Sequence, residues 1–247
     1  MSDLQIVHMK APVEQAVSWS YQDVVMGSAV YNRFVLGLYD PLVIFFENTF
    51  VWRCPSSKIL AFYNQHVSGN HLDVGVGTGY YLDKCRFPTA TPRIALLDLN
   101  PESLRFTAHR LRRYHPAVYQ ANVLEPIPHP LPRFDTIALT FLLHCMPGTL
   151  ATKGRLALNH LIPFLKPEGV LFGSTILGQG VEFGLLGRLF MRVYNSYLIP
   201  GCRVLYNVED RLSDLEDALA EYFEQYTVHM VGTVAFFAAS RHRRRGL

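Results

Sequence analysis

The segment most suited to ligand binding is an acidic residue followed by three spaced glycines: Asp73, Gly75, Gly77 and Gly79. Asp73 lies within a short apolar run that is typical of a buried strand, and the glycines follow this run. Glycine lets the backbone turn sharply and approach a ligand that a Cβ atom would exclude. The free N–H groups of a helix that begins after such a loop attract a negatively charged group. The spacing therefore predicts a strand, a ligand-binding loop and a helix, in that order.

A second acidic residue, Asp98, ends the next apolar run and lies 19 residues after Gly79. The carboxyl ends of neighbouring parallel strands meet at one edge of a sheet, where a carboxylate can accept both hydroxyl groups of a ribose. Taken alone, each feature has a purely structural explanation, because glycines occur in ordinary strand–helix turns and Asp98 could cap the helix that begins at Pro101. Asn100 is better placed for that cap. Together the two features predict a nucleoside cofactor.

The glycine pattern does not match two common nucleotide-binding motifs. A dinucleotide fingerprint that begins at Gly75 requires glycine at position 80, where this chain has Tyr80. A phosphate-binding P-loop requires Gly-Lys-Ser/Thr after the glycines, and that sequence does not follow them. A nicotinamide-dependent oxidoreductase is therefore a disfavoured alternative.

Five segments of the chain resemble the motifs of class I S-adenosyl-L-methionine (SAM)-dependent methyltransferases. They are residues 73–79, 95–100, 121–126, 134–144 and 165–171. Glu168 stands where glycine is commoner in the family. The resemblance covers residues 70–178 and leaves the first 68 residues and residues 179–209 unmatched. It implies a Rossmann-like fold, SAM as the methyl donor and S-adenosyl-L-homocysteine (SAH) as the product.

The resemblance also implies which residues hold the cofactor. The glycine backbone would lie against the methionine part, and Asp73 would orient the ammonium group. Asp98 would accept the ribose hydroxyls, and Leu99 would pack on the adenine. Asn122 stands where aspartate is common, and its amide oxygen can still accept a hydrogen bond from the adenine amine. The implied cofactor-binding set is Asp73, Gly75, Gly77, Gly79, Asp98, Leu99, Asn122, Val123, Thr140 and Phe141.

His144 is the candidate catalytic base, and it lies just beyond the fourth strand of the predicted sheet. Methyl transfer from a sulfonium is an in-line displacement in which the protein mainly positions the acceptor. A base is needed only when the acceptor atom carries a proton. The ordinary pKa of histidine, about 6.5, suits that task. The alternative is a loop histidine that shapes the cofactor pocket or bonds to the backbone.

These residues would be positioned by alternating strands and helices. The sequence shows short apolar runs that alternate with stretches of helical spacing. Such alternation predicts a parallel sheet that is buried on both faces. Two further runs, 226–230 and 233–239, flank Val231 and Gly232 and predict a hairpin. We expect an α/β fold with a Rossmann-like, seven-stranded, mostly parallel sheet, helices on both faces, a terminal antiparallel hairpin and an N-terminal helical cap. The helical stretches within this domain are residues 101–114, 149–165 and 210–223.

The predicted domain organisation has two parts. Residues 1–68 are rich in aromatic side chains at helical spacing and form a helical cap, and residues 69–247 form the SAM-binding domain. Residues 178–209 carry an apolar helix outside the normal cover of the sheet, which indicates a substrate lid. The alternatives for this insertion are extra core and a dimer contact, which would give a homodimer. The candidate substrate-binding residues are Tyr21, Tyr39, Phe190 and Tyr194. The alternative is that these aromatic side chains belong to the hydrophobic core, because core residues show the same helical spacing.

The composition excludes several classes of protein. Of the 247 residues, 49% are hydrophobic and 17% are charged, which is too apolar for a disordered chain. No stretch is long and apolar enough to indicate a membrane span. The net charge is +3, but four arginines lie in the last seven residues, so the rest carries −1 and shows no basic pattern for nucleic acid. The four cysteines and ten histidines have no metal-binding spacing, and reduced thiols indicate the cytoplasm.

We therefore expect a SAM-dependent methyltransferase that acts on oxygen, nitrogen or carbon of a hydrophobic or aromatic small molecule, such as a specialised metabolite. It is expected to work without a metal, mainly by proximity and orientation. The fourth strand is followed by Phe141-Leu142-Leu143-His144, and not by the Asn/Asp-Pro-Pro-Tyr/Phe sequence that resembles amino-methylating enzymes. The alternatives are a SAM-binding protein that catalyses a cyclisation or pericyclic step without methyl transfer, and a binding module.

Overall fold

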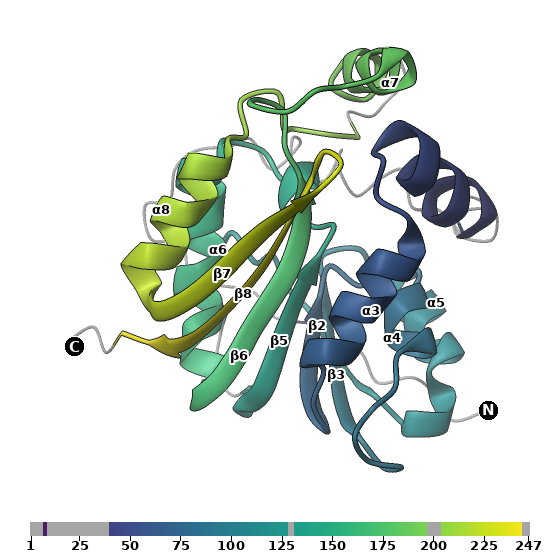
Figure 1. Cartoon of the computed structure of the whole chain (residues 1–247). Helices are drawn as coiled ribbons and strands as arrows, with labels where there is room; N and C mark the ends of the chain where they lie inside the picture. The colour runs from purple at the N-terminus through teal and green to yellow at the C-terminus, as the bar shows by residue number, and fades with distance from the viewer. Residues whose placement is uncertain (1–6, 9–39, 128–130, 197–203, 244–247) are drawn as a thin grey trace.

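The computed structural model describes residues 7–8, 40–127, 131–196 and 204–243. Its centre is one eight-stranded sheet in the order β1-β4-β3-β2-β5-β6-β8-β7 (Figure 1). β8 runs antiparallel to both of its neighbours, and every other neighbouring pair in this order is parallel. The strands are β1 (Val7–His8), β2 (Asn70–Val74), β3 (Arg93–Asp98), β4 (Ala117–Gln120), β5 (Phe134–Thr140), β6 (Leu165–Ile176), β7 (Phe223–Val231) and β8 (Val234–His242).

The expected seven-stranded, mostly parallel sheet with a terminal hairpin is confirmed. β7 and β8 form the antiparallel pair that ends the sheet, with Gly232 in the turn between them. The eighth strand, β1, is a two-residue addition at the other edge, where it pairs with β4. It was not expected, because residues 1–68 were assigned to a helical cap. A two-residue strand is too short to show a period in the sequence.

Helices cover both faces of the sheet, as Figure 1 shows. Each face has its own apolar cluster. One cluster includes Leu158 of α6 and Leu219 of α8, and the other includes Phe62 of α3 and Leu104 of α5. The central strands are therefore buried on both sides, which explains their continuous apolar runs. The helices are α3 (Ser56–His66), α4 (Tyr80–Lys84), α5 (Pro101–Arg110), α6 (Arg155–Leu161) and α8 (Leu212–Tyr222).

α5 begins where the sequence indicated. Asn100 is its N-cap, because the side-chain oxygen accepts a hydrogen bond from the N–H of Glu102 at 2.8 Å. Pro101 is the first helical residue, where its missing N–H costs no hydrogen bond. The cap function thus belongs to Asn100 rather than to Asp98, which leaves the Asp98 carboxylate available for another purpose.

Two helical segments lie together at one end of the sheet, η1 (Asp40–Val51, dark blue) and α7 (Leu185–Tyr194) (Figure 1). They contact one another, although they come from the predicted cap and the predicted insertion. The end of η1 is fixed to the β7–β8 turn, because the N–H and the hydroxyl of Thr233 donate to the Trp52 carbonyl at 3.0 and 3.1 Å. None of the helices in the described part of the chain is long and apolar enough to cross a membrane.

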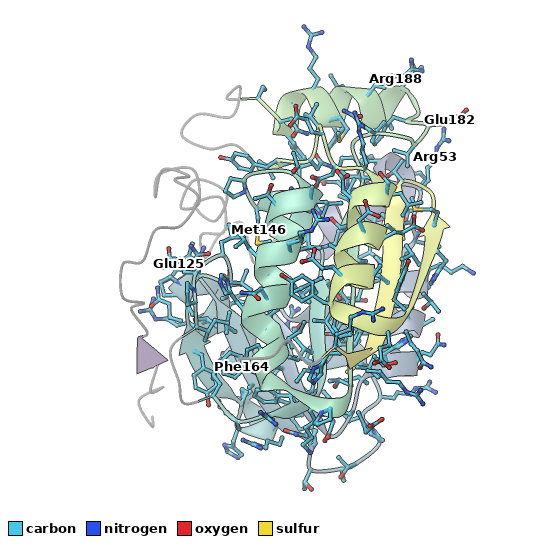
Figure 2. The ribbon with its side chains drawn as sticks, turned by 90° about the vertical axis from the view of Figure 1, so that its left-hand side faces the viewer. Arg53, Glu125, Met146, Phe164, Glu182 and Arg188 are labelled. Carbon is cyan, nitrogen blue, oxygen red and sulfur yellow. The ribbon has the colours of Figure 1, made fainter. Side chains whose placement is uncertain are left out.

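A buried ion pair joins the base of the insertion to the segment before α6. Lys153 Nζ lies 2.8 Å from Asp210 Oδ2, and neither side chain is exposed. The same ammonium donates to the carbonyls of Met146 and Tyr206 at 3.1 and 2.8 Å. Asp210 also accepts from the N–H of Leu150 at 3.1 Å. These contacts hold together two loops that are distant in sequence, and Figure 2 shows Met146 near the end of α6 that faces α7.

Candidate active site

A cavity of about 310 Å³ opens at the carboxyl ends of the parallel strands. Its walls include residues at or just beyond the ends of β2 to β6. This edge of an open α/β sheet is the usual ligand-binding position. All ten predicted cofactor residues line the cavity, and so do His144 and Tyr194. The sequence therefore located the cavity, while the binding function of each residue stays a prediction.

The glycine loop follows β2 and forms one wall of the cavity. Gly75 and Gly77 have φ angles of +73° and +51°, which L side chains rarely adopt. A Cβ atom on Gly75 would lie 2.6 Å from Leu142 Cδ1, so packing also excludes a side chain there. A Cβ atom on Gly77 would meet nothing within 4 Å. Gly77 therefore presents bare backbone to open space, as a cradle for a bound group requires.

Asp98 is held against this loop at the end of β3. Its Oδ1 accepts the N–H of Asn100 at 2.8 Å. Burial raises the pKa of Asp98 to about 6, and hydrogen bonds from backbone amides, those of Val76 and Gly77 among them, limit the rise. The carboxylate is thus oriented by the loop itself while it lines the cavity. In its ionised form the carboxylate can accept hydrogen bonds from hydroxyl groups.

Asp73 is a second buried acid in the same wall. The hydroxyl of Tyr63, which α3 supplies, donates to Asp73 Oδ1 at 2.8 Å. Burial raises the pKa of Asp73 to about 7, the hydrogen bond from Tyr63 opposes this, and the charge of Asp98 adds to it. An acid whose ionised form is disfavoured by burial and by a neighbouring acid is stabilised by a cation. The wall therefore suits a positively charged ligand.

Tyr63 is a site residue that the sequence did not single out. It belongs to the aromatic N-terminal segment and lies ten positions before Asp73. Its hydroxyl also lies 3.4 Å from His71 Nε2, and His71 Nδ1 lies 2.8 Å from Thr136 Oγ1. Only the helical spacing of buried aromatics was visible in the sequence, and this spacing does not show which hydroxyl faces an acid.

The adenine side of the predicted site is built around Asn122. Its Oδ1 accepts the N–H of Leu124 at 3.0 Å, and its Nδ2 donates to Glu125 Oε1 at 2.9 Å. A carbonyl oxygen has two lone pairs, so Oδ1 retains one for a ligand amine. Val123 is buried beside it, and its carbonyl lies 2.9 Å from His160 Nδ1. The amide is therefore fixed in place by its own turn.

Thr140 and Phe141 line the cavity at the end of β5. Phe141 has a φ of +57°, which is uncommon for a residue with a side chain. Its N–H donates to the Ser174 carbonyl of β6 at 2.9 Å, which holds this conformation. The Phe141 ring meets the His144 ring edge-on, with centroids 5.4 Å apart. Strained backbone of this kind concentrates at functional sites.

His144 is buried in a way that bears on its predicted function as a base. Its Nδ1 accepts the N–H of Ile176 at 3.2 Å, so the proton of the neutral ring sits on Nε2. Burial lowers the pKa of His144 to about 3, and the charge of Lys153 adds to this. A neutral ring with its free nitrogen already protonated donates a hydrogen bond and does not take a proton. The base assignment stays a prediction, and this geometry weighs against it.

The remaining wall comes from η1 and α7. Tyr194 of α7 donates its hydroxyl to Glu47 Oε1 of η1 at 2.8 Å, and both residues line the cavity. Phe190 does not line the cavity and packs edge-on against Tyr194 with ring centroids 5.2 Å apart. Tyr21 and Tyr39 lie outside the described residues. Within the described residues, no cluster of three or more His, Cys, Asp or Glu side chains could hold a metal ion.

The comparison with known proteins agrees with this geometry. A family model described as a methyltransferase domain matches residues 72–171. The chain is 39% identical over 218 residues to demethylluteothin O-methyltransferase of Streptomyces thioluteus, which covers 88% of this chain and 92% of the relative. It is 36% identical over 219 residues to the physcion biosynthesis cluster O-methyltransferase of Aspergillus chevalieri, with 87% and 95% covered. The chain therefore belongs to the class I SAM-dependent methyltransferases.

Solved structures show the same fold at low sequence identity. The DhpI–SAH complex aligns with a TM-score of 0.65 and 15% identity over 92% of this chain and 100% of that chain. The N-methyltransferase NodS from Bradyrhizobium japonicum WM9, in complex with SAH, aligns with a TM-score of 0.52 and 16% identity over 76% and 85%. The protein is a SAM-dependent methyltransferase of small molecules, and SAM is its cofactor.

Proposed function

We propose that the protein transfers the methyl group of SAM to a hydroxyl oxygen of a flat, apolar small molecule. The observation that carries this proposal is the wall that η1 and α7 form, where the carboxyl group of Glu47 lies among apolar and aromatic side chains. A hydroxyl must lose its proton on methylation, and a carboxylate at the acceptor end can take it. The names of two relatives as O-methyltransferases support oxygen as the acceptor.

Nitrogen is the second candidate acceptor. One relative, named N-methyltransferase vrtF from Penicillium aethiopicum, is 36% identical and covers 77% of each chain. An amine acceptor also loses a proton, so the same wall could serve it. The hydroxyl is preferred because the relatives with the greater coverage carry the O-methyltransferase name.

Each part of SAM is proposed to bind a different set of residues in the cavity wall. Asp73 and the glycine backbone hold the methionine part of SAM, Asp98 holds the ribose, and Leu99, Asn122 and Val123 enclose the adenine. Bound SAM supplies an activated methyl group on a positively charged sulfur. The raised pKa of Asp73 supports this placement, because a buried acid gains from the positive charge of a nearby ammonium group.

The acceptor is proposed to lie between the cap, residues 1–68, and the insertion, residues 178–209, over the SAM-binding domain of residues 69–247. The hydrogen bond between Glu47 and Tyr194 supports this, because it joins the two segments at the cavity. A small-molecule substrate rather than nucleic acid, and the cytoplasm as the compartment, are proposed on the charge and the cysteine spacing. A homodimer through the insertion stays a proposal.

The test is SAH release from a panel of phenolic, enolic and amine acceptors, preceded by calorimetric titration with SAM and, separately, with NADH. We expect micromolar binding of SAM, none of NADH, and SAH release with hydroxyl acceptors. SAH release with amines alone would replace the hydroxyl by nitrogen. SAM binding without SAH release from any acceptor in the panel would contradict the proposal.

A further inference from the structure

Glu47 is a buried acid on a helical segment whose neighbouring phenylalanines are exposed. Its side chain is 8% exposed, whereas Phe46 and Phe50 of the same segment are 46% and 61% exposed. An amphipathic helix normally buries its aromatic residues and exposes its acids. Burial of a carboxylate costs free energy unless a cation or donors compensate it. The orientation of η1 therefore places a costly acid in the cavity, for which a ligand is a direct explanation.

The compensation that the described residues give the Glu47 carboxylate is small. The hydroxyl of Tyr194 donates a hydrogen bond to Glu47 Oε1, and this donor is neutral. The two residues lie 147 positions apart in the sequence. Within the described part of the chain, no lysine, arginine or histidine forms an ion pair with Glu47. Its neighbour Asn48 is different, because its amide donates to Tyr81 and Ser56 and has a structural function. Among the described residues, Tyr194 alone forms a hydrogen bond with the Glu47 side chain, which lines the cavity.

In the described ranges, the charged groups around η1 supply no counter-ion for Glu47. Arg53 and the α7 residue Arg188 are exposed, and Figure 2 shows both at the outer end of the molecule near Glu182. Arg192 of α7 and Lys58 of α3 are exposed as well. Burial raises the pKa of Glu47 to about 6, and the hydrogen bond from Tyr194 lowers it. None of the titratable groups that share the cavity adds to this shift, namely Tyr63, Asp73, Tyr80, Tyr81, Asp98, His144 and Cys145.

The other candidate bases in the cavity are engaged elsewhere. The accepting nitrogen of His144 is bonded to the N–H of Ile176. Asp73 is bonded to Tyr63 in the wall assigned to the cofactor. Asp98 is bonded to backbone amides of its own loop. Glu47 is the acid that η1 contributes to the cavity, where the hydroxyl of Tyr194 of α7 is bonded to it.

We infer that Glu47 is the general base of the methyl transfer and that Tyr194 is the residue that positions its carboxylate. This inference rests on the proposed O-methylation. The proton of the acceptor hydroxyl moves to Glu47, the hydroxyl oxygen bonds to the methyl carbon of SAM, and the carbon–sulfur bond breaks with its electron pair left on sulfur. Neutral SAH and the methyl ether result, and the proton on Glu47 then passes to water.

The same geometry narrows the acceptor to acidic hydroxyls. A carboxylate is a weak base, so it assists a phenol or enol, whose pKa is about 10 or lower, far better than an alkyl alcohol. The apolar and aromatic lining from Trp52, Phe141 and Leu205 suits a conjugated ring that carries such a hydroxyl. The structure thus favours phenolic or enolic acceptors over aliphatic alcohols.

The experiment compares wild type with Glu47→Gln, which keeps the size and hydrogen bonds of the side chain. The acceptors are phenols and naphthols of matched size, from weakly acidic ones to nitro-substituted ones that are ionised at neutral pH. With weakly acidic acceptors we expect SAH release to fall about 10²–10⁴-fold. With pre-ionised acceptors the loss should be much smaller. The control is Glu224→Gln on the exposed face of β7, with unchanged rates.

A second variant keeps the inference testable if Glu47→Gln folds poorly. Tyr194→Phe removes the hydrogen bond that lowers the pKa of Glu47. In wild type the rate should rise with pH up to about pH 6 and then level off, because only the ionised carboxylate accepts a proton. In Tyr194→Phe this rise should move to higher pH. In infrared titration without acceptor, the difference between wild type and Glu47→Gln should isolate one buried carboxyl that titrates near pH 6.

Three results would overturn the inference. They are an unchanged rate in folded Glu47→Gln, an equal loss for all acceptors, and a Glu47 carboxyl that titrates at its ordinary value. Failure of the proposed function gives a different result, in which wild type binds SAM and releases no SAH from any hydroxyl acceptor. The infrared titration separates the two cases, because it does not depend on turnover.

Discussion

The two sides of the cavity are built in different ways. On the side proposed to hold SAM, the wall is formed mainly by backbone. The glycine loop turns after β2, and amides of the loop and of Asn100 orient the Asp98 carboxylate. On the side proposed for the acceptor, a side-chain hydrogen bond joins Glu47 of η1 to Tyr194 of α7. Backbone geometry allows little variation without loss of the site, whereas side chains on separate segments can change independently. The first arrangement suits a constant cofactor and the second suits a substrate that differs between relatives.

The largest predicted effect concerns the anchoring of the acceptor side. Replacement of Lys153 by Met leaves the Asp210 carboxylate buried without its cation. We expect the free energy of unfolding to fall by about 3–5 kcal/mol, measured by urea denaturation. The control is Lys166→Met, which breaks an exposed pair with Asp135 and should cost at most about 1 kcal/mol. Equal losses in the two variants would show that the buried pair does not anchor the insertion.

The next effect concerns the cofactor side alone. Asp98→Ala removes the acceptor proposed for the ribose hydroxyls, and hydrogen bonds to a charged group contribute about 1.5–3 kcal/mol. We expect the affinity for SAM to fall by about 10- to 100-fold in calorimetric titration. Asp135→Ala, an exposed acid at the start of β5, should bind SAM as wild type does. Unchanged affinity in Asp98→Ala would remove Asp98 from the ribose site.

The smallest effect tests whether the N-terminal part of the chain contributes to the cofactor side. Tyr63→Phe removes a hydrogen bond that lowers the pKa of Asp73, so this pKa should rise beyond about 7. The ionised form of Asp73 attracts the ammonium of SAM, so affinity should increase as the pH rises through this pKa. In Tyr63→Phe the increase should occur at higher pH, with several-fold weaker binding at pH 7. The control is Tyr226→Phe on the exposed β7, and an identical pH profile in Tyr63→Phe would exclude this coupling.

The residues proposed to bind the cofactor could be placed on the cavity from the sequence, because their signals are local. Asp73 and the glycines are contiguous, Asn100 caps the helix that follows Asp98, and the apolar runs show both faces of the sheet to be buried. β1 could not be predicted, because two residues carry no period. The helical character of the end of the cap is confirmed by η1 and α3.

The acceptor side could be predicted only in part, because its contacts are distant in sequence. Tyr194 was identified from helical spacing, but its partner Glu47 was visible only as a charge that interrupts an apolar stretch. His144 was placed on the correct edge of the sheet, and its hydrogen bond to Ile176 depends on strand register, which spacing does not reveal. Sequence patterns thus predicted positions more readily than hydrogen-bond partners.

The most direct test of the division between the two sides is calorimetric titration of Asp98→Ala and Glu47→Gln with SAM, beside wild type. The account predicts that Asp98→Ala binds SAM about 10- to 100-fold more weakly and that Glu47→Gln binds it as wild type does. Weakening of SAM binding in Glu47→Gln to the same degree as in Asp98→Ala would contradict the account, because Glu47 would then belong to the cofactor site.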